Sequence, residues 1–281
     1  MEHEPTLVDF TLPAFRLFVL EKQASRKYEE HRYKRPIDDH PSSSDIHGFY
    51  RGVRAFSTWL FEEGLVPVNV MAPLKLPKLE DKKLRPLTPD EELTLLNAYS
   101  EHKMGECRDK AIFMLLLSTG IRRAELLGFQ DASVNLEEGF ITVWGKGKKQ
   151  RSVPFGFKTG WVLQRYRLLH RPEPATPAVQ AFFLSRDGYW MTGASLEMVF
   201  RRARQRSGIA RLHAHLLRHT FGTRSAELGI PTLTLQRFMG HSQPNVTERY
   251  SHVASSERIK RDRSYDHLDA MELRVRRPKL R

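Results

Sequence analysis

The apolar positions in the first quarter of the chain recur with the period of an α-helix. Residues 12–33 carry apolar side chains at helical spacing, and Ser44–Glu63 forms a second run that is strongly amphipathic. A polar break with prolines and serines separates the two runs. Arg51 and Arg54 lie off the apolar stripe of the second run, so this helix has one core face and one basic face. The pattern predicts a helical domain over residues 1–74.

Residues 75–87 interrupt the helical pattern and carry several positive charges. Prolines recur from Pro73 to Pro89 at a spacing that prevents a helix, and the lysines keep the segment solvated. We therefore expect a linker between two domains. Two interpretations stay open: a solvated tether, or a basic strap along a DNA backbone in which Lys75 and Lys78 contact phosphates.

Residues 88–281 show a mixed pattern. Thr88 is followed by proline and acidic residues, which is typical of a helix start, and an apolar helix over Asp109–Thr119 is expected to stop at Gly120. Two β-rich runs, Phe140–Trp144 and Arg151–Phe155, flank a glycine-containing turn and predict a hairpin. Further helices are predicted at Lys158–Arg171, Ser195–Ser207, His215–Leu228, Pro231–Met239 and Ser255–Leu273. The fold class predicted is mainly α with a small β-sheet (α+β).

Composition narrows the class of protein. The chain has 281 residues, enough for two domains, and its 46 Lys and Arg against 33 Asp and Glu give a net charge of +13. Such an excess favours a polyanion such as a nucleic acid, although ribosomal and membrane-surface proteins share it. The single cysteine excludes an intramolecular disulfide framework. The apolar run Ala111–Leu117 is too short to span a membrane, so we expect a soluble intracellular protein with no membrane partner.

One candidate site directly follows the apolar helix, and a second lies in the predicted hairpin. Arg122 and Glu125 are three residues apart, so the carboxylate is close enough to orient a neighbouring side chain. An arginine at the edge of a core commonly just extends its charge into solvent, and that interpretation stays open for Arg122 alone. Lys146 lies between two glycines in the hairpin turn, which lacks the residues of a phosphate-binding P-loop. A lone lysine in a turn is ordinarily solvated.

Two more sites lie in the last third of the chain. His215 and Arg218 are three residues apart on a predicted helix and can face one ligand. His215 and His219 have the spacing of zinc ligands, but no Glu follows His215 and only one cysteine is available, so no metal is expected. His241, just past a predicted helix end, could contact an anion or a backbone carbonyl. Tyr250 could be an ordinary half-buried aromatic residue.

Taken together, these stretches resemble the motifs of the tyrosine recombinase (phage integrase) family. All six family positions are present in order, specifically across Thr88–Val253 and more loosely over residues 1–85. The motifs are Thr119-Gly120-Ile121-Arg122-Arg123-Ala124-Glu125-Leu126, Gly145-Lys146-Gly147, His215-Leu216-Leu217-Arg218-His219-Thr220, Gly240-His241-Ser242 and Arg249-Tyr250-Ser251-His252-Val253. The resemblance implies a helical N-terminal core-binding, SAM-like DNA-binding domain and a catalytic domain over residues 88–281.

The resemblance also implies a site-specific recombinase or integrase that works through a covalent 3′-phosphotyrosine intermediate. The implied catalytic residues are Arg122, Lys146, His215, Arg218, His241 and Tyr250, with Glu125 supporting His215 or Arg122. The two arginines suit the charge of a phosphate, because guanidinium matches phosphate in a bidentate manner. By the resemblance, His215 accepts the proton of Tyr250, Lys146 donates one to the leaving 5′ hydroxyl, and His241 hydrogen-bonds the scissile phosphate. No cofactor is expected, since the sequence shows no carboxylate cluster for a divalent ion.

The expected partner is double-stranded DNA. The residues expected to contact it are Arg51, Arg54, Lys75, Lys78, Arg201 and Arg202, and the alternative for the arginine-rich stretch 201–206 is a solvated face. The resemblance implies a monomer when free, a homotetramer on two paired DNA sites, and a C-terminal segment that docks on a neighbouring protomer. The expected location is the cytoplasm, at the nucleoid. A type IB topoisomerase-like enzyme and a catalytically silent DNA-binding factor remain as alternatives.

Overall fold

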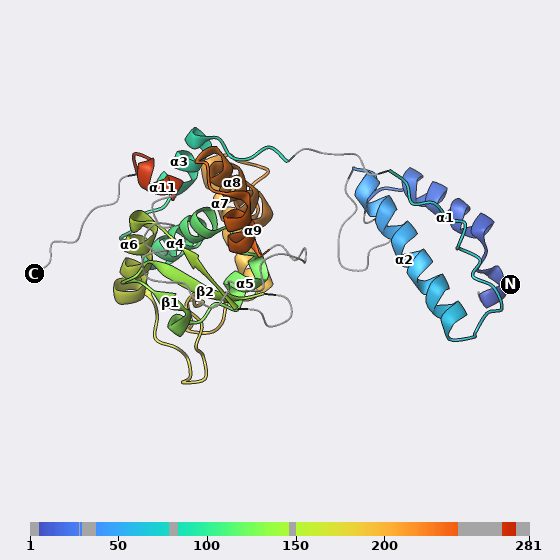
Figure 1. The fold of residues 1–281 in the computed structure, drawn as a ribbon, viewed down its shortest axis with the longest axis horizontal. Coiled ribbons are helices and arrows are strands. Elements are labelled where there is room, and N and C mark those ends of the chain that lie inside the picture. Colours follow the sequence, from blue (N-terminus) through green and yellow to red (C-terminus); the bar gives the residue numbers. More distant parts are fainter. Residues whose placement is uncertain are drawn as a thin grey trace, which may run out of the picture. The chain divides into compact units, whose positions relative to one another are not determined.

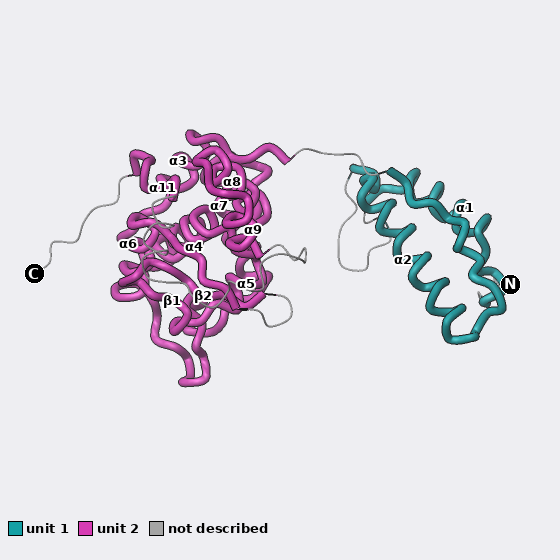
Figure 2. Tube along the Cα trace, viewed as in Figure 1, with its two compact units in different colours: residues 1–83 teal, residues 84–281 magenta. Residues whose placement is uncertain are grey.

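The chain forms two compact units, residues 1–83 and 84–281, which are coloured separately in Figure 2. The structure, a computed structural model, describes residues 6–27, 29, 38–78, 84–145, 150–240 and 266–273. Figure 1 shows that the first unit is helical and that the second combines helices with one small sheet. The predicted α+β class is therefore confirmed. No helix within the described ranges is long and apolar enough to cross a membrane.

The first unit contains two helices, α1 (Leu12–Ala24) and α2 (Ser43–Glu62). A capping box between Ser42 and Asp45 starts α2, because each residue satisfies the backbone N–H of the other. Helix α1 ends well before residue 33, since Ser25 turns to extended backbone and its hydroxyl donates to the carbonyl of Lys22. The core consists of Phe15, Val19, Ile46, Met71 and Leu74, so the chain after α2 folds back onto both helices.

The second unit begins inside the segment that the sequence pattern assigned to the linker. Neither residues 75–78 nor residues 84–88 are helical, but Leu87 is fully buried in the core of the second unit. Its backbone is held at both ends: its N–H donates to Thr220 Oγ1 at 2.9 Å, and its carbonyl accepts from Arg224 at 2.8 Å. The chain is thus fixed against the second unit before Thr88 starts the next helix.

The elements of the second unit surround one buried helix. They are α3 (Pro89–Asn97), α4 (Met104–Thr119), α5 (Arg123–Leu127), β1 (Val134–Asn135), β2 (Phe140–Trp144), β3 (Gln150–Pro154), α6 (Phe157–Arg165), α7 (Gly193–Ser207), α8 (Ala214–Glu227), α9 (Thr232–Met239) and α11 (His267–Ala270). The strands form an antiparallel sheet in the order β1-β2-β3, in which Val143 pairs with Arg151. Helix α4 packs against α6 and α8, and every residue of Ala111–Leu117 is fully buried.

The buried helix α4 and the helix after β3 also differ from their predicted ranges. Helix α4 starts at Met104, five residues before the predicted start. Its N-cap is Lys103, whose side chain makes no cap hydrogen bond, so no capping residue marks this start in the sequence. The predicted helix Lys158–Arg171 is α-helical only to Arg165 and continues as a π-helical turn over Tyr166–His170. Tyr166 is fully buried there, and its hydroxyl accepts a hydrogen bond from the Leu184 N–H at 3.1 Å.

The C-terminal residues 266–273 pack on their own unit. Leu268 lies in the main core, and the Asp266 carboxylate accepts hydrogen bonds from Ser118 Oγ and from the Gly156 N–H. The Asp269 carboxylate accepts from the Phe157 and Lys158 N–H groups at 2.7 and 2.8 Å and so caps α6. Of the predicted helix Ser255–Leu273, the described part is helical only over α11. Residues 251–265 and 274–281, on which docking to a neighbour would also depend, lie outside the described residues.

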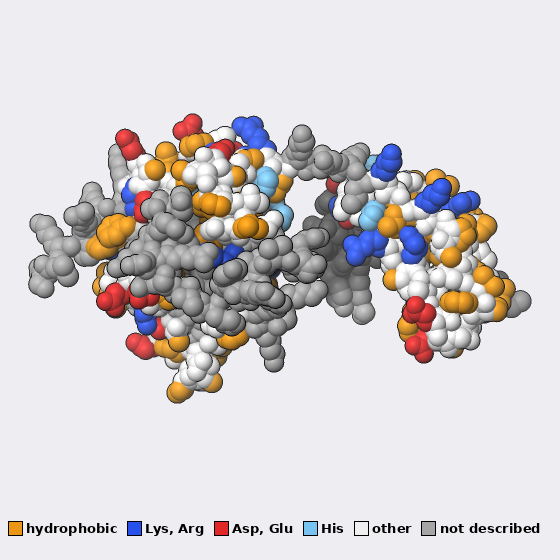
Figure 3. Space-filling model, in the orientation of Figure 1, with side chains coloured by type: hydrophobic (Ala, Val, Ile, Leu, Met, Phe, Trp, Pro, Cys, Tyr) orange, Lys and Arg blue, Asp and Glu red, His pale blue; other side chains and the backbone are white. Residues whose placement is uncertain are grey.

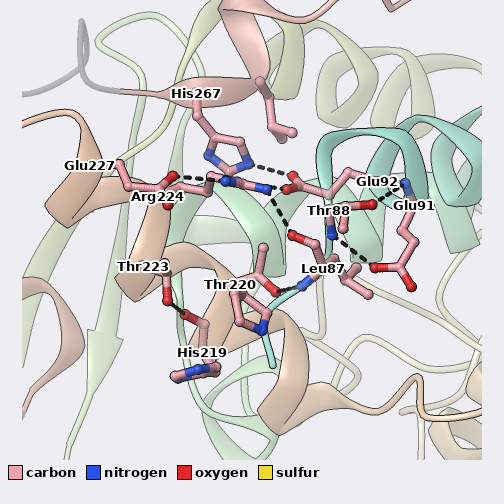
Figure 4. A network of polar contacts seen from close by, with 12 residues as sticks. Leu87, Thr88, Glu91, Glu92, His219, Thr220, Thr223, Arg224, Glu227 and His267 are labelled. Carbon is pink, nitrogen blue, oxygen red and sulfur yellow. Dashed lines mark hydrogen bonds and ion pairs between the residues drawn. The ribbon is translucent and has the colours of Figure 1, made fainter. Parts of the chain in front are cut away.

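A buried carboxylate joins this C-terminal segment to α8 (Figure 4). Glu92 of α3 is fully buried and accepts hydrogen bonds from Arg224 Nε at 3.1 Å and from His267 Nε2 at 2.7 Å. Arg224 also pairs with Glu227 at 2.7 Å. The network connects α3, α8 and α11.

Candidate active site

Arg122 is placed by the turn that ends α4. Gly120 adopts a left-handed conformation (φ 60°), and a Cβ atom there would lie 2.2 Å from the ring of Phe221, so the turn requires glycine. The extended backbone of Arg122 then starts α5, and its N–H donates to Glu125 Oε2 at 2.7 Å. The guanidinium donates to Glu125 Oε1 at 3.1 Å and to the carbonyl of Gly240 at 2.6 Å. Its side chain remains 40% exposed and can meet a ligand.

Arg218 lies beside Arg122 and is buried. It lies on α8, is 5% exposed, and donates to the carbonyls of Gly120 and Met239, both at 2.5 Å. Since Arg122 binds the next carbonyl along the chain, at Gly240, the two guanidinium groups converge on the end of α9. Burial, together with the charge of Arg122, lowers the pKa of Arg218 to about 10. The group is still a cation at neutral pH.

A third arginine, Arg151, completes this cluster. Its guanidinium donates to both carboxylate oxygens of Glu125 at 2.8 Å and, through Nε, to the carbonyl of Phe238 at 2.8 Å. Burial alone would raise the pKa of Glu125, but the hydrogen bonds from Arg151 and Arg122 outweigh it and lower the pKa below 4.5. Three guanidinium charges and one carboxylate leave the cluster with two positive charges.

His215 lies one turn before Arg218 on the same helix and is exposed. Partial desolvation of the ring lowers its pKa from 6.5, and the neighbouring His213 and Arg218 act in the same direction. The imidazole is therefore neutral at pH 7 and can accept a proton. His215 and Glu125 form no hydrogen bond in the described part of the chain, where Glu125 pairs with the two arginines instead.

The remaining candidate residues fall outside the described residues. Lys146 lies between β2 and β3 in the sequence, where the structure describes the chain only up to Gly145 and again from Gln150. His241 and Tyr250 lie in the stretch 241–265. Gly240, the residue before His241, is held by Arg122, so this stretch begins at the arginine cluster.

The first unit carries the candidate DNA contacts of α2 and of the segment after it. Arg51 and Arg54 are exposed and line an open hollow of about 520 Å³ together with Leu76 and the small residues of α2. Lys75 and Lys78, which flank Leu76, are also exposed. Figure 3 shows Lys and Arg side chains gathered on one part of this unit, apart from its acidic side chains.

The arginines of α7 are mostly paired inside the second unit. Arg202 forms an ion pair with the buried Asp109 at 2.9 Å, Arg204 pairs with Glu197, and Arg206 pairs with Glu106. Arg201 is exposed. Because α4 rises about 15 Å between Asp109 and Thr119, Arg202 lies near the opposite end of α4 from Arg122. A phosphate contact by Arg202 has to compete with an existing ion pair.

Sequence reasoning missed the role of Arg151. A signal was available, because strand alternation puts Arg151 on the same face as Val153 and Phe155, and a charged residue on a buried face needs a partner. No group of three or more His, Cys, Asp or Glu side chains in the described ranges could hold a metal ion.

Comparisons with known proteins agree on one family. A model described as the phage integrase family matches residues 85–257. Tyrosine recombinase XerD of Neisseria meningitidis serogroup A is 32% identical over 199 residues, which cover 70% of this chain and 68% of that protein. Tyrosine recombinase XerC of Thermodesulfovibrio yellowstonii is 31% identical over 206 residues, which cover 72% of this chain and 68% of that protein.

The fold is also shared with a solved structure. The Tn1549 transposon integrase, in complex with circular intermediate DNA, superposes with a TM-score of 0.63. The match covers 89% of this chain and 84% of that one, at 22% sequence identity. At this identity the likeness establishes the fold, and the assignment of roles depends on the chain's own residues.

Proposed function

Because this chain is a site-specific tyrosine recombinase of the phage integrase family, we propose that it cleaves and rejoins DNA through a bond between Tyr250 and a 3′ phosphate. The proposal is carried by one observation, the convergence of Arg122 and Arg218 on the end of α9. Arg218 is buried, and its acceptors in the described structure are uncharged carbonyls. A buried cation of this kind is stabilised by an anion such as a phosphodiester.

The arginine pair fits the charge that develops during cleavage. Attack on a phosphodiester concentrates negative charge on its non-bridging oxygens, and cations fixed in advance at that position lower the barrier. A guanidinium has five N–H donors, of which each arginine uses two in the contacts described above. The remaining donors can bind the phosphate, and Glu125 keeps Arg122 oriented toward it.

The other catalytic candidates attack the phosphorus, bind the phosphate and transfer the protons of the reaction. The phenolic oxygen of Tyr250 attacks the phosphorus and gives its proton to His215, while the bond from phosphorus to the 5′ oxygen breaks. Lys146 donates a proton to that leaving oxygen, and His241 hydrogen-bonds the phosphate. The phosphotyrosine conserves the energy of the broken bond, so attack by another 5′ hydroxyl reverses the step without ATP. These roles follow the family pattern of the sequence, and the lowered pKa of His215 supports its part.

A recombinase acts on DNA, and the distribution of charge suggests how this chain binds it. We assign DNA binding to residues 1–74, with Arg51 and Arg54 on α2, and to Lys75 and Lys78 of the linker 75–87; catalysis is assigned to residues 88–281. The exposure of these four side chains and the net charge of +13 support the assignment. We further propose a monomer that assembles as a tetramer on two paired DNA sites and acts at the nucleoid in the cytoplasm.

The activity is tested with nicked duplexes of randomised sequence. A short fragment released at the nick diffuses away after cleavage, so rejoining fails and the covalent complex accumulates. We expect the protein to form such complexes and to enrich one DNA sequence among them. Efficient relaxation of supercoiled plasmids that lack the enriched sequence would identify a topoisomerase instead. Binding without any covalent complex would identify a silent DNA-binding factor.

The cleavage rate is expected to fall at low pH as His215 becomes protonated. Its pKa lies below 6.5 in the folded protein, so the neutral base is present at neutral pH and is lost as the pH falls through that lowered value. Single-turnover cleavage of the enriched duplex should therefore show an acid limb with a midpoint below pH 6.5. In His215→Gln this limb should disappear and the plateau rate should fall by about 10². An acid limb that persists unchanged in His215→Gln would exclude His215 as the proton acceptor.

A further inference from the structure

Arg151 stands apart from the six family positions, yet it makes more side-chain hydrogen bonds than either of the other two arginines in the cluster. It is the second residue of β3, five residues after Lys146 in the sequence, and its side chain is only 10% exposed. Its three hydrogen bonds, all at 2.8 Å, reach Glu125 and the carbonyl of Phe238. One guanidinium therefore links the strand β3, the turn before α5 and the end of α9.

The contacts of Arg151 determine how Glu125 can bind Arg122. Arg151 engages both oxygens of Glu125 as a bidentate pair, the stronger arrangement for guanidinium and carboxylate. Arg122 consequently has a single, longer side-chain contact of 3.1 Å to Glu125. Its other nitrogen is free to bind the carbonyl of Gly240, and the side chain remains partly exposed.

The same guanidinium lies against the start of the segment that leads to Tyr250. A Cβ atom on Gly240 would lie 3.0 Å from the Cζ atom of Arg151 and 3.2 Å from Nη1 of Arg122. Gly240 is therefore enclosed by both arginines, and its left-handed φ of 60° also favours glycine. Arg151 fixes the carbonyl of Phe238 two residues earlier, so it holds the backbone that Arg122 binds.

We propose that Arg151 is a positioning residue for the cleavage step. It positions Arg122 by holding both carboxylate oxygens of Glu125. Without Arg151, the ionised and buried Glu125 would keep Arg122 as its one ion-pair partner in the described structure. Arg122 would then turn into a bidentate pair with Glu125 and withdraw its donors from the phosphate. The inference rests on the proposed function, since it concerns how Arg151 keeps Arg122 available to the scissile phosphate.

The test compares Arg151→Met with the double variant Arg151→Met/Glu125→Gln in single-turnover cleavage of the enriched duplex. Arg151→Met is expected to lower the cleavage rate by about 10², the effect of losing one donor to the transition state. The double variant is expected to recover about tenfold of that loss, because glutamine has no charge with which to hold Arg122. DNA affinity should be unchanged in both variants. A purely structural role would make the second substitution add to the damage.

Two further variants control for folding and for charge. Arg167→Met removes a guanidinium from a half-exposed ion pair with Asp131 in the same unit and should cleave at the wild-type rate. Arg151→Lys keeps the charge without the bidentate geometry and should lie between wild type and Arg151→Met. Wild-type cleavage by Arg151→Met, or a double variant no faster than Arg151→Met, would overturn the inference. If wild type itself forms no covalent complex, the proposed function fails instead.

Discussion

Arg218→Ala is expected to lower the single-turnover cleavage rate by about 10³ while leaving most of the DNA affinity intact. The buried guanidinium of Arg218 is held by the carbonyls of Gly120 and Met239, so it is fixed in position before any phosphate arrives. Removing one such donor from an oxyanion site typically costs about 10²–10³ in rate, and Arg218 supplies charge as well. Affinity depends on many phosphate contacts and should change much less.

Arg218→Lys separates charge from geometry in this first prediction. Lysine keeps a positive charge but cannot bind two carbonyls and a phosphate in one plane, so we expect a cleavage rate close to that of Arg218→Ala. Thermal unfolding of each variant shows whether the α8–α9 region remains folded. Cleavage by a folded Arg218→Ala protein within a few fold of wild type would remove Arg218 from the reaction.

Arg122→Ala is expected to lower the cleavage rate by about 10²–10³, whereas Arg123→Ala should leave it unchanged. The two arginines are adjacent in sequence, but the structure separates them. Arg122 binds Glu125 and Gly240, while the exposed Arg123 donates to the carbonyl of Gly193 at 2.6 Å. The measurement is single-turnover cleavage of the same nicked duplex by both variants. Equal losses in the two variants would show that the cluster around Glu125 does not determine which arginine acts.

Local patterns predicted much of the fold. The β2–β3 hairpin follows from alternation on both sides of a glycine-containing turn, and both strand ranges match within one residue. The stop of α4 at Gly120 follows from glycine's freedom at positive φ. The spacing of His215 and Arg218 on one helix also holds, because α8 covers both. Each of these features depends on residues that are close together in sequence, so a local sequence pattern is enough to predict it.

Features that depend on residues far apart in sequence could not be predicted from local patterns. The π-helical turn after α6 accompanies the burial of Tyr166 against Phe182 and Phe183, which periodicity does not reveal. Residues 266–273 pack on their own unit because Asp266 and Asp269 meet the start of α6, about 110 residues earlier in the chain. The sequence pattern presents Arg202 as a phosphate contact, yet its partner Asp109 lies on another helix.

The arginine cluster shows the same division between local and distant information. The motif pattern identified Arg122, Arg218 and Glu125, and the structure brings all three to the end of α9. Arg151 could be noticed from strand alternation, but its partner could not, since Glu125 and Phe238 are far from it in sequence. Convergence of this kind arises from tertiary packing around α4.

The most direct test of the account is to identify the residue that becomes bonded to DNA. The protein is incubated with the enriched nicked duplex in excess EDTA, the covalent complex is digested, and the modified peptide is identified by mass spectrometry. We expect a 3′-phosphotyrosine at Tyr250 with EDTA present, and no complex from a Tyr250→Phe protein that still binds the duplex. A covalent complex formed by Tyr250→Phe, or one that maps to a different residue, would contradict the account.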